Sequence, residues 1–533
     1  MSNTWGWAVG AVLAAVLAGC PQQGVVCQAG TARCGSGCAD FSADVRNCGA
    51  CGNACATGQE CSAGACVCAP GTAACDGACV VTTTDARHCG GCGKACAPGD
   101  VCSAETEPDG TVAGTCQSTC TGGKVQCGQG CVDLDSDAQH CGACGNACDN
   151  QRSCRDGVCA YDVVLACSSF GQVAGLRAAD LAQGPKVSLG SAPAALGRYG
   201  DGLLVADSGD RRLYQLSLGG HEDRSPADGG APAVGSIPNQ VVGLQAEGKV
   251  LVANGDLGTL QVLSAAPLDG GAGLALQTVG EVNLGENSFP QGVAVVDGVA
   301  WVTLYGGFDA QTAAAGQKVV PVDLATLDAG TPVDLSKLDL KPFDGQAAAP
   351  LARPMTLVPW NGKLYGALNN LDIGYVPAGP GMVVELDPQT RALAAVDLGA
   401  VCLNATSVVA AGDALYVACT GKVTYAPPTY AATAVEKAGV VKLGRGASGA
   451  LERLAAWSVA CPANGGDCPV VGRLAVTGGR VFVTDQAVGR LFVLSAADLS
   501  ELSGFSTGGP VQACPAPDGV STFSSYIGDV LAP

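Results

Sequence analysis

The sequence predicts an all-β protein, a seven-bladed β-propeller (with six or eight blades as alternatives) preceded by three small disulfide-rich modules. In residues 161–533, short apolar runs alternate with Gly, Asp, Asn and Pro, and copies of one run recur 47 to 66 residues apart. In residues 27–160, cysteines recur in three clusters with one spacing. The aligned apolar runs begin at Leu204, Leu251, Trp301, Tyr365, Tyr416 and Phe482.

The chain begins with an apolar run over residues 7–17, which is too short for a bilayer that needs about 20 residues. The run ends in Leu17-Ala18-Gly19-Cys20, a stretch that resembles the lipobox of bacterial lipoproteins. The resemblance implies a signal peptide over 1–19, a lipid on Cys20 and a tether over 20–26. Pro21 replaces the Asp that retains such proteins at the inner membrane, which implies the outer membrane, facing the periplasm or the cell surface. The alternative is an ordinary signal peptide with Cys20 in a disulfide.

The three cysteine modules cover residues 27–67, 68–119 and 120–160. Each follows C-x6-C-x3-C-x9-C-x2-C-x3-C-x5-C and ends with an eighth cysteine at a variable distance. Units this short and rich in Gly cannot bury a large core, so we expect about four disulfides to stabilise each one. Eight cysteines allow 105 pairings, so the connectivity stays open.

The resemblance of these modules to stigma-specific-protein-like cysteine-rich repeats rests on residues 47–55, 88–96 and 140–148. It implies an extracellular spacer or binding module and brings no catalytic residues. A zinc site is not expected, because export favours disulfides and Asn47 stands where the other modules have His88 and His140.

The propeller is expected to close by joining its two ends. The first apolar run, ending at Cys167, lacks a preceding strand, and the tail 514–533 contains a candidate strand without a following partner. Cys402 precedes Cys419 by 17 residues, which places the start of a first strand opposite the end of a second strand. Cys514 and Cys167 take the equivalent places in the split blade. We therefore predict the bridges Cys402–Cys419, Cys167–Cys514 and, by elimination, Cys461–Cys468.

Residues 202–208 and 479–485 give residues 161–533 a diffuse resemblance to NHL-like and YVTN-like propellers. That group includes binding proteins, scaffolds and lactonase-type enzymes, so the resemblance implies a fold without fixing a function.

Three consecutive blades have long loops after the aligned run, over residues 304–317, 368–380 and 420–439. Equivalent loops emerge on one face of a propeller, so we expect their aromatic side chains to form a binding surface there. The alternative is that each aromatic packs on its own blade. The candidate ligand-binding residues are Tyr305, Phe308, Tyr375, Tyr425 and Tyr430.

These observations predict an envelope-anchored lipoprotein whose propeller binds a protein, peptide or polysaccharide. The net charge of −19 argues against nucleic acid. We expect no cofactor and no catalytic residues, because the propeller contains one isolated histidine, His221, and no catalytic motif. One alternative is a lactonase-type hydrolase holding calcium; another is a spacer without a ligand. The conceivable calcium donors are Asp207, Asn254, Asn369 and Asp485.

Overall fold

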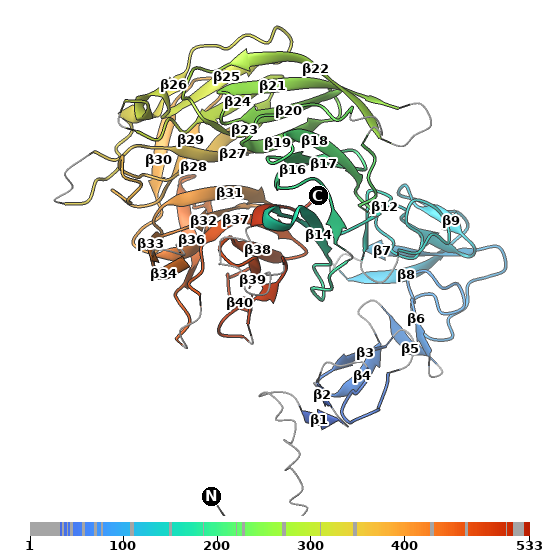
Figure 1. The fold of residues 1–533 in the computed structure, drawn as a ribbon. Helices are drawn as coiled ribbons and strands as arrows, with labels where there is room; N and C mark the ends of the chain where they lie inside the picture. Colours follow the sequence, from blue (N-terminus) through green and yellow to red (C-terminus); the bar gives the residue numbers. More distant parts are fainter. Residues whose placement is uncertain are drawn as a thin grey trace, which may run out of the picture. The chain divides into compact units, whose positions relative to one another are not determined.

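The structure of the chain is a computed structural model (Figure 1). It forms two compact units, Met1–Leu134 and Asp135–Pro533. The structure describes residues 32–34, 37–39, 41–42, 46–55, 59–68, 72–75, 78–106, 111–148, 152–184, 186–219, 221–225, 230–268, 273–309, 311–344, 349–426, 431–463, 467–507, 509–514 and 527–533.

The first unit consists of short β-hairpins joined by turns, as expected for segments that are stabilised by disulfides. Strand β10 also pairs with β7 in parallel, which links two hairpins into a four-stranded sheet. The hairpins are β1 (Ala32–Cys34) with β2 (Gly37–Ala39), β3 (Gln59–Ser62) with β4 (Ala65–Cys68), β5 (Ala73–Cys75) with β6 (Ala78–Val80), β7 (Val101–Thr106) with β8 (Val112–Gln117), and β9 (Val125–Cys127) with β10 (Gly130–Val132).

The cysteine pairing, which the spacing leaves open, follows one pattern. In residues 68–119 the first cysteine bonds the third, the second the fifth, the fourth the seventh and the sixth the eighth. The described bridges of the neighbouring modules fit the same pattern. The bridges in residues 68–119 are Cys68–Cys79, Cys75–Cys92, Cys89–Cys102 and Cys96–Cys116. Those beside them are Cys34–Cys51, Cys48–Cys61, Cys55–Cys66, Cys120–Cys131, Cys141–Cys154 and Cys148–Cys159.

The second unit begins inside the third cysteine module, because residues 135–160 pack with the propeller. Its first hairpin is β11 (Ser153–Arg155) with β12 (Val158–Ala160). The Arg155 guanidinium donates to Asp162 Oδ1 from Nε and Nη2, at 3.1 and 3.0 Å. Asp162 Oδ2 in turn accepts the Ala178 N–H of the first blade at 2.8 Å. This buried carboxylate therefore joins the module directly to the propeller.

Seven antiparallel sheets follow, which confirms the seven-bladed propeller (Figure 1). Six of them are complete within one stretch of chain. From the inner strand outward these are β16 (Pro193–Tyr199), β17 (Gly202–Asp207), β18 (Arg212–Ser217); β19 (Pro238–Leu244), β20 (Lys249–Asn254), β21 (Thr259–Pro267), β22 (Leu274–Asn283); β23 (Pro290–Val296), β24 (Val299–Leu304), β25 (Lys318–Asp323), β26 (Val333–Asp334); β27 (Pro354–Trp360), β28 (Lys363–Leu368), β29 (Met382–Leu386), β30 (Leu393–Asp397); β31 (Ala405–Ala411), β32 (Ala414–Cys419), β35 (Ala438–Arg445), β36 (Leu451–Val459); and β37 (Val471–Thr477), β38 (Arg480–Asp485), β39 (Arg490–Ser495), β40 (Glu501–Ser503), with β41 (Val511–Gln512) beside β39.

The seventh sheet joins the two ends of the propeller, as predicted. Strand β42 (Ile527–Leu531), at the end of the chain, pairs with β13 (Val163–Cys167), and β14 (Gln172–Leu176) and β15 (Val187–Ser188) complete the blade. The pairing removes two open sheet edges that would otherwise face each other.

The second strand of each blade is the most buried, because both of its faces pack against neighbouring blades. In β17, β20 and β38 every residue after the first is buried. Side chains on the inner strands also accept backbone N–H groups of the next blade. These links are Asp529 to Leu196 at 3.0 Å, Gln240 to Val293 at 2.6 Å and Thr356 to Val408 at 2.7 Å.

Helical structure among the described residues is confined to three one-turn 3-10 segments, η1 (Ser168–Phe170), η2 (Ala313–Ala315) and η3 (Leu335–Lys337). No described helix has the length and apolar character needed to cross a membrane.

Candidate functional site

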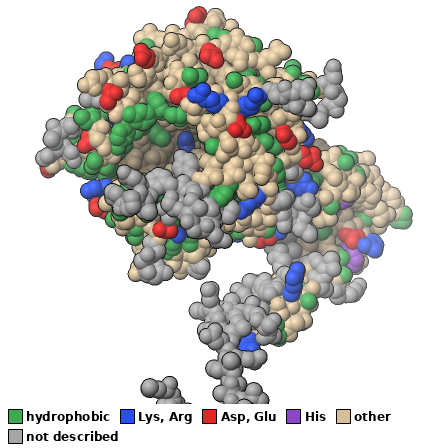
Figure 2. All heavy atoms as spheres, in the orientation of Figure 1, with side chains coloured by type: hydrophobic (Ala, Val, Ile, Leu, Met, Phe, Trp, Pro, Cys, Tyr) green, Lys and Arg blue, Asp and Glu red, His purple; other side chains and the backbone are tan. Residues whose placement is uncertain are grey.

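A pocket of about 420 Å³ lies where the three long loops of consecutive blades meet; we call it the aromatic pocket. Its volume falls within the range of about 300–1,000 Å³ that is typical of ligand sites. In the space-filling view the face toward the reader is hollowed, with hydrophobic side chains along one side of the hollow (Figure 2). The aromatic pocket is lined by Gln291, Tyr305, Phe308, Met355, Asn369, Leu371, Tyr375, Val376, Pro377, Asn404, Thr406, Thr420, Gly421, Lys422, Val423 and Tyr425.

Four of the five predicted aromatic residues line this pocket: Tyr305, Phe308, Tyr375 and Tyr425. Ring centroids are 6.4 Å apart between Tyr305 and Phe308, and 5.9 Å apart between Phe308 and Tyr375. Phe308, Tyr425 and Tyr375 are 56%, 45% and 38% exposed, whereas Tyr305 is 8% exposed. Tyr305 thus packs within the protein, while the other three present ring surface to the pocket. Tyr430, the fifth candidate, lies outside the described residues.

The third insertion is a β-hairpin rather than the loop expected from the sequence. Strand β33 (Lys422–Ala426) pairs with β34 (Ala431–Glu436), between the second and third strands of its blade. Gly421 starts the hairpin with φ = +78°, and a Cβ there would lie 2.4 Å from the Glu436 carbonyl oxygen. Glycine is therefore required at this turn, both for the backbone angle and for space.

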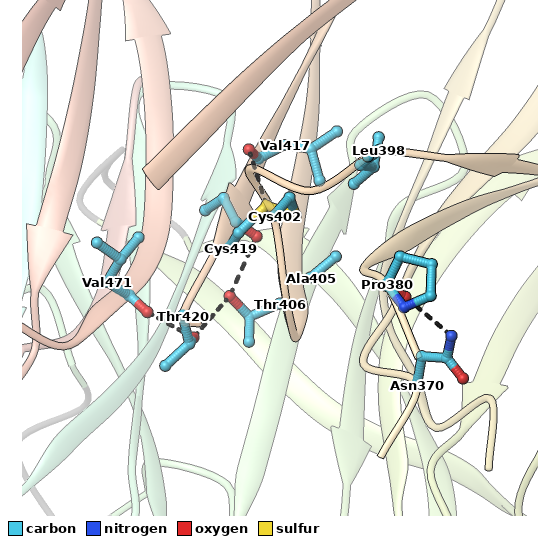
Figure 3. Close-up of a disulfide and its surroundings, with 12 residues drawn as sticks. Asn370, Pro380, Leu398, Cys402, Ala405, Thr406, Val417, Cys419, Thr420 and Val471 are labelled. Atoms are coloured by element: carbon cyan, nitrogen blue, oxygen red, sulfur yellow. Dashed lines mark hydrogen bonds between the residues drawn. A yellow bond between two sulfur atoms is a disulfide. The ribbon is translucent and has the colours of Figure 1, made fainter. Parts of the chain in front are cut away.

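The Cys402–Cys419 bridge lies at the base of this hairpin (Figure 3). Thr420 directly follows the bridge, and its hydroxyl donates to the Val471 carbonyl of the next blade at 2.6 Å. The Thr406 hydroxyl donates to the Gly472 carbonyl at 3.0 Å. Because Thr406 and Thr420 also line the pocket, these bonds fix one pocket wall to the next blade.

Three equivalent positions beside the aromatic pocket have left-handed backbones. Phe289, Arg353 and Asn404, each directly before the first strand of a consecutive blade, have φ of 52°, 42° and 53°. Non-glycine residues adopt this region rarely, and such conformations cluster at functional sites. The Phe289 and Phe308 ring centroids are 4.5 Å apart, and Asn404 lines the pocket itself.

Arg353 is fully buried behind the aromatic wall. Its guanidinium carbon lies 4.8 Å from the ring centroid of Tyr305 and 4.7 Å from that of Tyr375. Nη1 donates to the Gly307 carbonyl at 3.3 Å, whereas Nε and Nη2 have no hydrogen-bond partner among the described residues. A buried cation thus adjoins the pocket, and no described carboxylate forms an ion pair with it.

The hydroxyls of the wall remain protonated at neutral pH. Burial raises the pKa of Tyr305 to about 12, although the positive charge of Arg353 opposes the rise. Burial also raises the pKa of Tyr375, and Arg353 again opposes it. Of the two, Tyr375 is the more exposed, so its hydroxyl is the one that can donate a hydrogen bond to a ligand in the pocket.

The four conceivable calcium donors come from four different blades, at or directly after the end of the second strand, and bond to the backbone around them. Asp207 accepts the Ala192 N–H at 2.8 Å, Asn254 accepts the Gly235 N–H at 2.9 Å and Asp485 accepts the Val470 N–H at 3.0 Å. Asn369 donates to the Ala405 carbonyl at 2.8 Å. In three blades the side chain thus fixes the segment that enters its own blade.

The remaining sequence-predicted site residues are cysteines. The structure joins Cys167 to Cys514 and Cys461 to Cys468, in addition to the bridge at the pocket. Cys20 lies outside the described residues.

Sequence reasoning missed Arg353 and Asn404. Neither belongs to a motif, and both precede a strand rather than following the aligned apolar run. A signal was available for Arg353, because Arg353 and Phe289 each stand before a proline that opens the first strand of a blade. Asn404 stands before Ala405 and shares only this place before a first strand.

Comparison with known proteins gives a family match for a short part of the chain. Residues 104–162 match the model of the Stigma-specific STIG1-like protein family, which covers the end of the second cysteine module and the third. No curated protein matches the chain.

Solved structures resemble the chain at low sequence identity. A protein from Lactobacillus plantarum is 15% identical with a TM-score of 0.44, covering 69% of this chain and 98% of its own. AztD from Citrobacter koseri, in its apo form, is 14% identical with a TM-score of 0.38, covering 66% and 96%. Streptogramin B lyase is 12% identical with a TM-score of 0.36, covering 58% and 81%. The chain therefore combines a cysteine-rich segment similar to STIG1-like proteins with a seven-bladed β-propeller.

Proposed function

We propose that the protein is a cell-envelope binding protein and that its propeller binds a polysaccharide in the aromatic pocket. The observation that carries this proposal is that Phe308, Tyr375 and Tyr425, from three separate insertions, present exposed rings to one pocket. Aromatic residues are only 5% of the chain, so this concentration is unusual within it. Exposed aromatic groups are typical of binding sites.

The polar groups of the pocket favour a sugar chain over a purely apolar ligand. Gln291, Asn369 and Asn404 line it together with the aromatic rings, and Asn404 Oδ1 has no hydrogen-bond partner among the described residues. A sugar offers hydroxyl groups for such amides and an apolar ring face for the aromatic side chains. Ligand pockets typically combine apolar walls with a few orienting polar groups in this way.

We also propose that a lipid on Cys20 anchors the protein to the outer membrane, because Leu17-Ala18-Gly19-Cys20 resembles a lipobox. The cysteine-rich modules would then connect the anchor to the propeller. Mass analysis of the mature protein isolated from membranes tests the anchor; a mature N-terminus other than a lipid-modified Cys20 would contradict it.

Removal of one exposed ring tests the pocket. We expect Phe308→Ala, in the full chain, to weaken binding of polygalacturonate at least fivefold in isothermal titration, because Phe308 contacts both Tyr305 and Tyr375. The matched control is Leu454→Ala, which removes a 57% exposed apolar side chain outside the pocket. Equal loss in both variants, or no loss in Phe308→Ala, would contradict the assignment of the pocket.

A further inference from the structure

We infer that the aromatic pocket selects an acidic polysaccharide, one whose sugar units carry carboxylate groups. The inference rests on the proposed function and extends it to the charge of the ligand. It is carried by the buried cation Arg353 behind the pocket wall, which has no ion pair with a described side chain, and by the distribution of charges around the pocket.

Arg353 places a buried positive charge directly behind the pocket wall. It is fully buried, and two of its three guanidinium nitrogens lack a hydrogen-bond partner among the described residues. No described carboxylate forms an ion pair with it. The faces of the Tyr305 and Tyr375 rings stabilise part of this charge, but a buried charge without an opposite charge remains unfavourable and is stabilised further when an anion binds close to it.

The aromatic wall connects this charge to the pocket. The guanidinium carbon lies 4.8 and 4.7 Å from the ring centroids of Tyr305 and Tyr375, and both rings line the pocket. An anion on the pocket side of the rings would therefore be separated from the guanidinium by the aromatic rings and would be attracted by its charge. The protonated hydroxyl of the partly exposed Tyr375 can donate to that anion. Arg353 thus acts as a positioning residue, through the two tyrosines.

The charged residues of the pocket lining also favour an anionic ligand. Although the chain has a net charge of −19, the described lining contains Lys422 and no aspartate or glutamate. Lys422 is exposed and lies opposite the exposed Glu436 in the hairpin, and no described side chain forms an ion pair with it. The nearby Asp309 and Asp372 accept hydrogen bonds from their own loops, at 2.8 Å from the Thr312 N–H and 2.8 Å from the Gly374 N–H.

A cationic ligand is disfavoured by the same geometry. Aromatic rings attract cations through their faces, but Arg353 already lies over Tyr305 and Tyr375. A second cation in the pocket would be repelled by Arg353 and Lys422. The pocket is therefore suited to a ligand that combines apolar ring faces, hydroxyl groups and negative charge.

The sharpest test compares polygalacturonate with its methyl ester, because the two polymers share the sugar chain and the ester replaces each charged carboxylate by a neutral group. We expect the full-length protein to bind the acid form at least tenfold more tightly in isothermal titration at low salt, and raised salt should weaken only that form. We expect Arg353→Gln to reduce this preference at least threefold, and Arg353→Lys to retain most of it.

Lys422→Gln provides a second variant that does not depend on a buried site. The side chain is exposed, so we expect the variant to keep the melting temperature of the wild type while lowering the preference for the acid form severalfold. An unchanged preference in both Lys422→Gln and a folded Arg353→Gln would overturn the inference.

The outcomes separate the inference from the proposed function. If the wild type binds both polymers equally and Phe308→Ala weakens binding of both, the charge preference is overturned and the assignment of the binding site is supported. Absence of binding to either polymer would overturn both. Tighter binding of poly-glutamate than of polygalacturonate would contradict a polysaccharide ligand and indicate an acidic peptide instead.

Discussion

His221 shows how burial changes the chemistry of a single side chain. The sequence places it in a polar loop, but the structure leaves it 1% exposed, with its ring centroid 4.9 Å from that of Tyr161. Neither ring nitrogen has a hydrogen-bond partner among the described residues. Burial, with a smaller effect from the charge of Arg152, lowers the pKa of His221 from 6.5 to about 4.

This pKa predicts a pH-dependent stability. Between about pH 6.5 and pH 4 the unfolded state binds the proton and the folded state does not, so stability is complete above pH 6.5 and falls as the pH falls. The shift corresponds to a loss of about 3 kcal/mol in the free energy of unfolding. We expect the fall in melting temperature from pH 7.5 to pH 4.5 to be smaller for His221→Phe than for the wild type.

His140→Asn is the matched control for removing a histidine. Asn47 supplies the equivalent acceptor in the first module, where it binds the Gly52 N–H at 2.8 Å, as His140 binds the Gly145 N–H at 2.9 Å. Parallel pH profiles for the wild type and His221→Phe would show that another group dominates.

At the scale of elements, the insertion between β32 and β35 forms a wall of the aromatic pocket. The register of β33 with β34 runs from Lys422↔Glu436 to Ala426↔Ala431, with an irregularity at Thr424 and Tyr425. Its position depends on the turn at Gly421 and on the disulfide beside it.

Substitution of Gly421 should therefore displace the hairpin without opening the propeller. In Gly421→Ala the new Cβ would meet the Glu436 carbonyl oxygen at 2.4 Å, whereas Gly412→Ala places a Cβ at φ = +55° in open space. Both variants carry left-handed strain of about 1–2 kcal/mol. We expect faster proteolysis between residues 420 and 438 only in Gly421→Ala, and weaker polygalacturonate binding in the same variant. Equal proteolysis of both variants would contradict the steric role of Gly421.

At the scale of the whole propeller, the last strand and one disulfide close the ring. Cys167 and Cys514 are separated by 347 residues, whereas Cys402 and Cys419 are separated by 17. Cross-linking stabilises mainly by restricting the unfolded chain, and the effect grows with the length of the loop.

Removal of the two bridges should thus have unequal effects. We expect the double variant Cys167→Ser/Cys514→Ser to lose about 6 kcal/mol in the free energy of unfolding, and Cys402→Ser/Cys419→Ser about 3 kcal/mol, as upper estimates from loop entropy. Urea unfolding followed by intrinsic fluorescence measures both. A larger loss from the shorter loop would show that local packing, rather than closure of the ring, dominates.

The repeated features of this protein could be predicted from the order of its residues. Strand periodicity and cysteine spacing are local, so they predicted the seven blades, the pairing of the tail with the first blade and the regions that insert aromatic residues. Which side chains from different blades contact one another became clear from the three-dimensional packing. Arg353 meets Tyr305 and Tyr375 because consecutive blades place their entry segments and insertions side by side. Packing then buried this guanidinium with two of its nitrogens lacking a hydrogen-bond partner among the described residues, a property that depends on the surrounding side chains and has no signature in the spacing of residues.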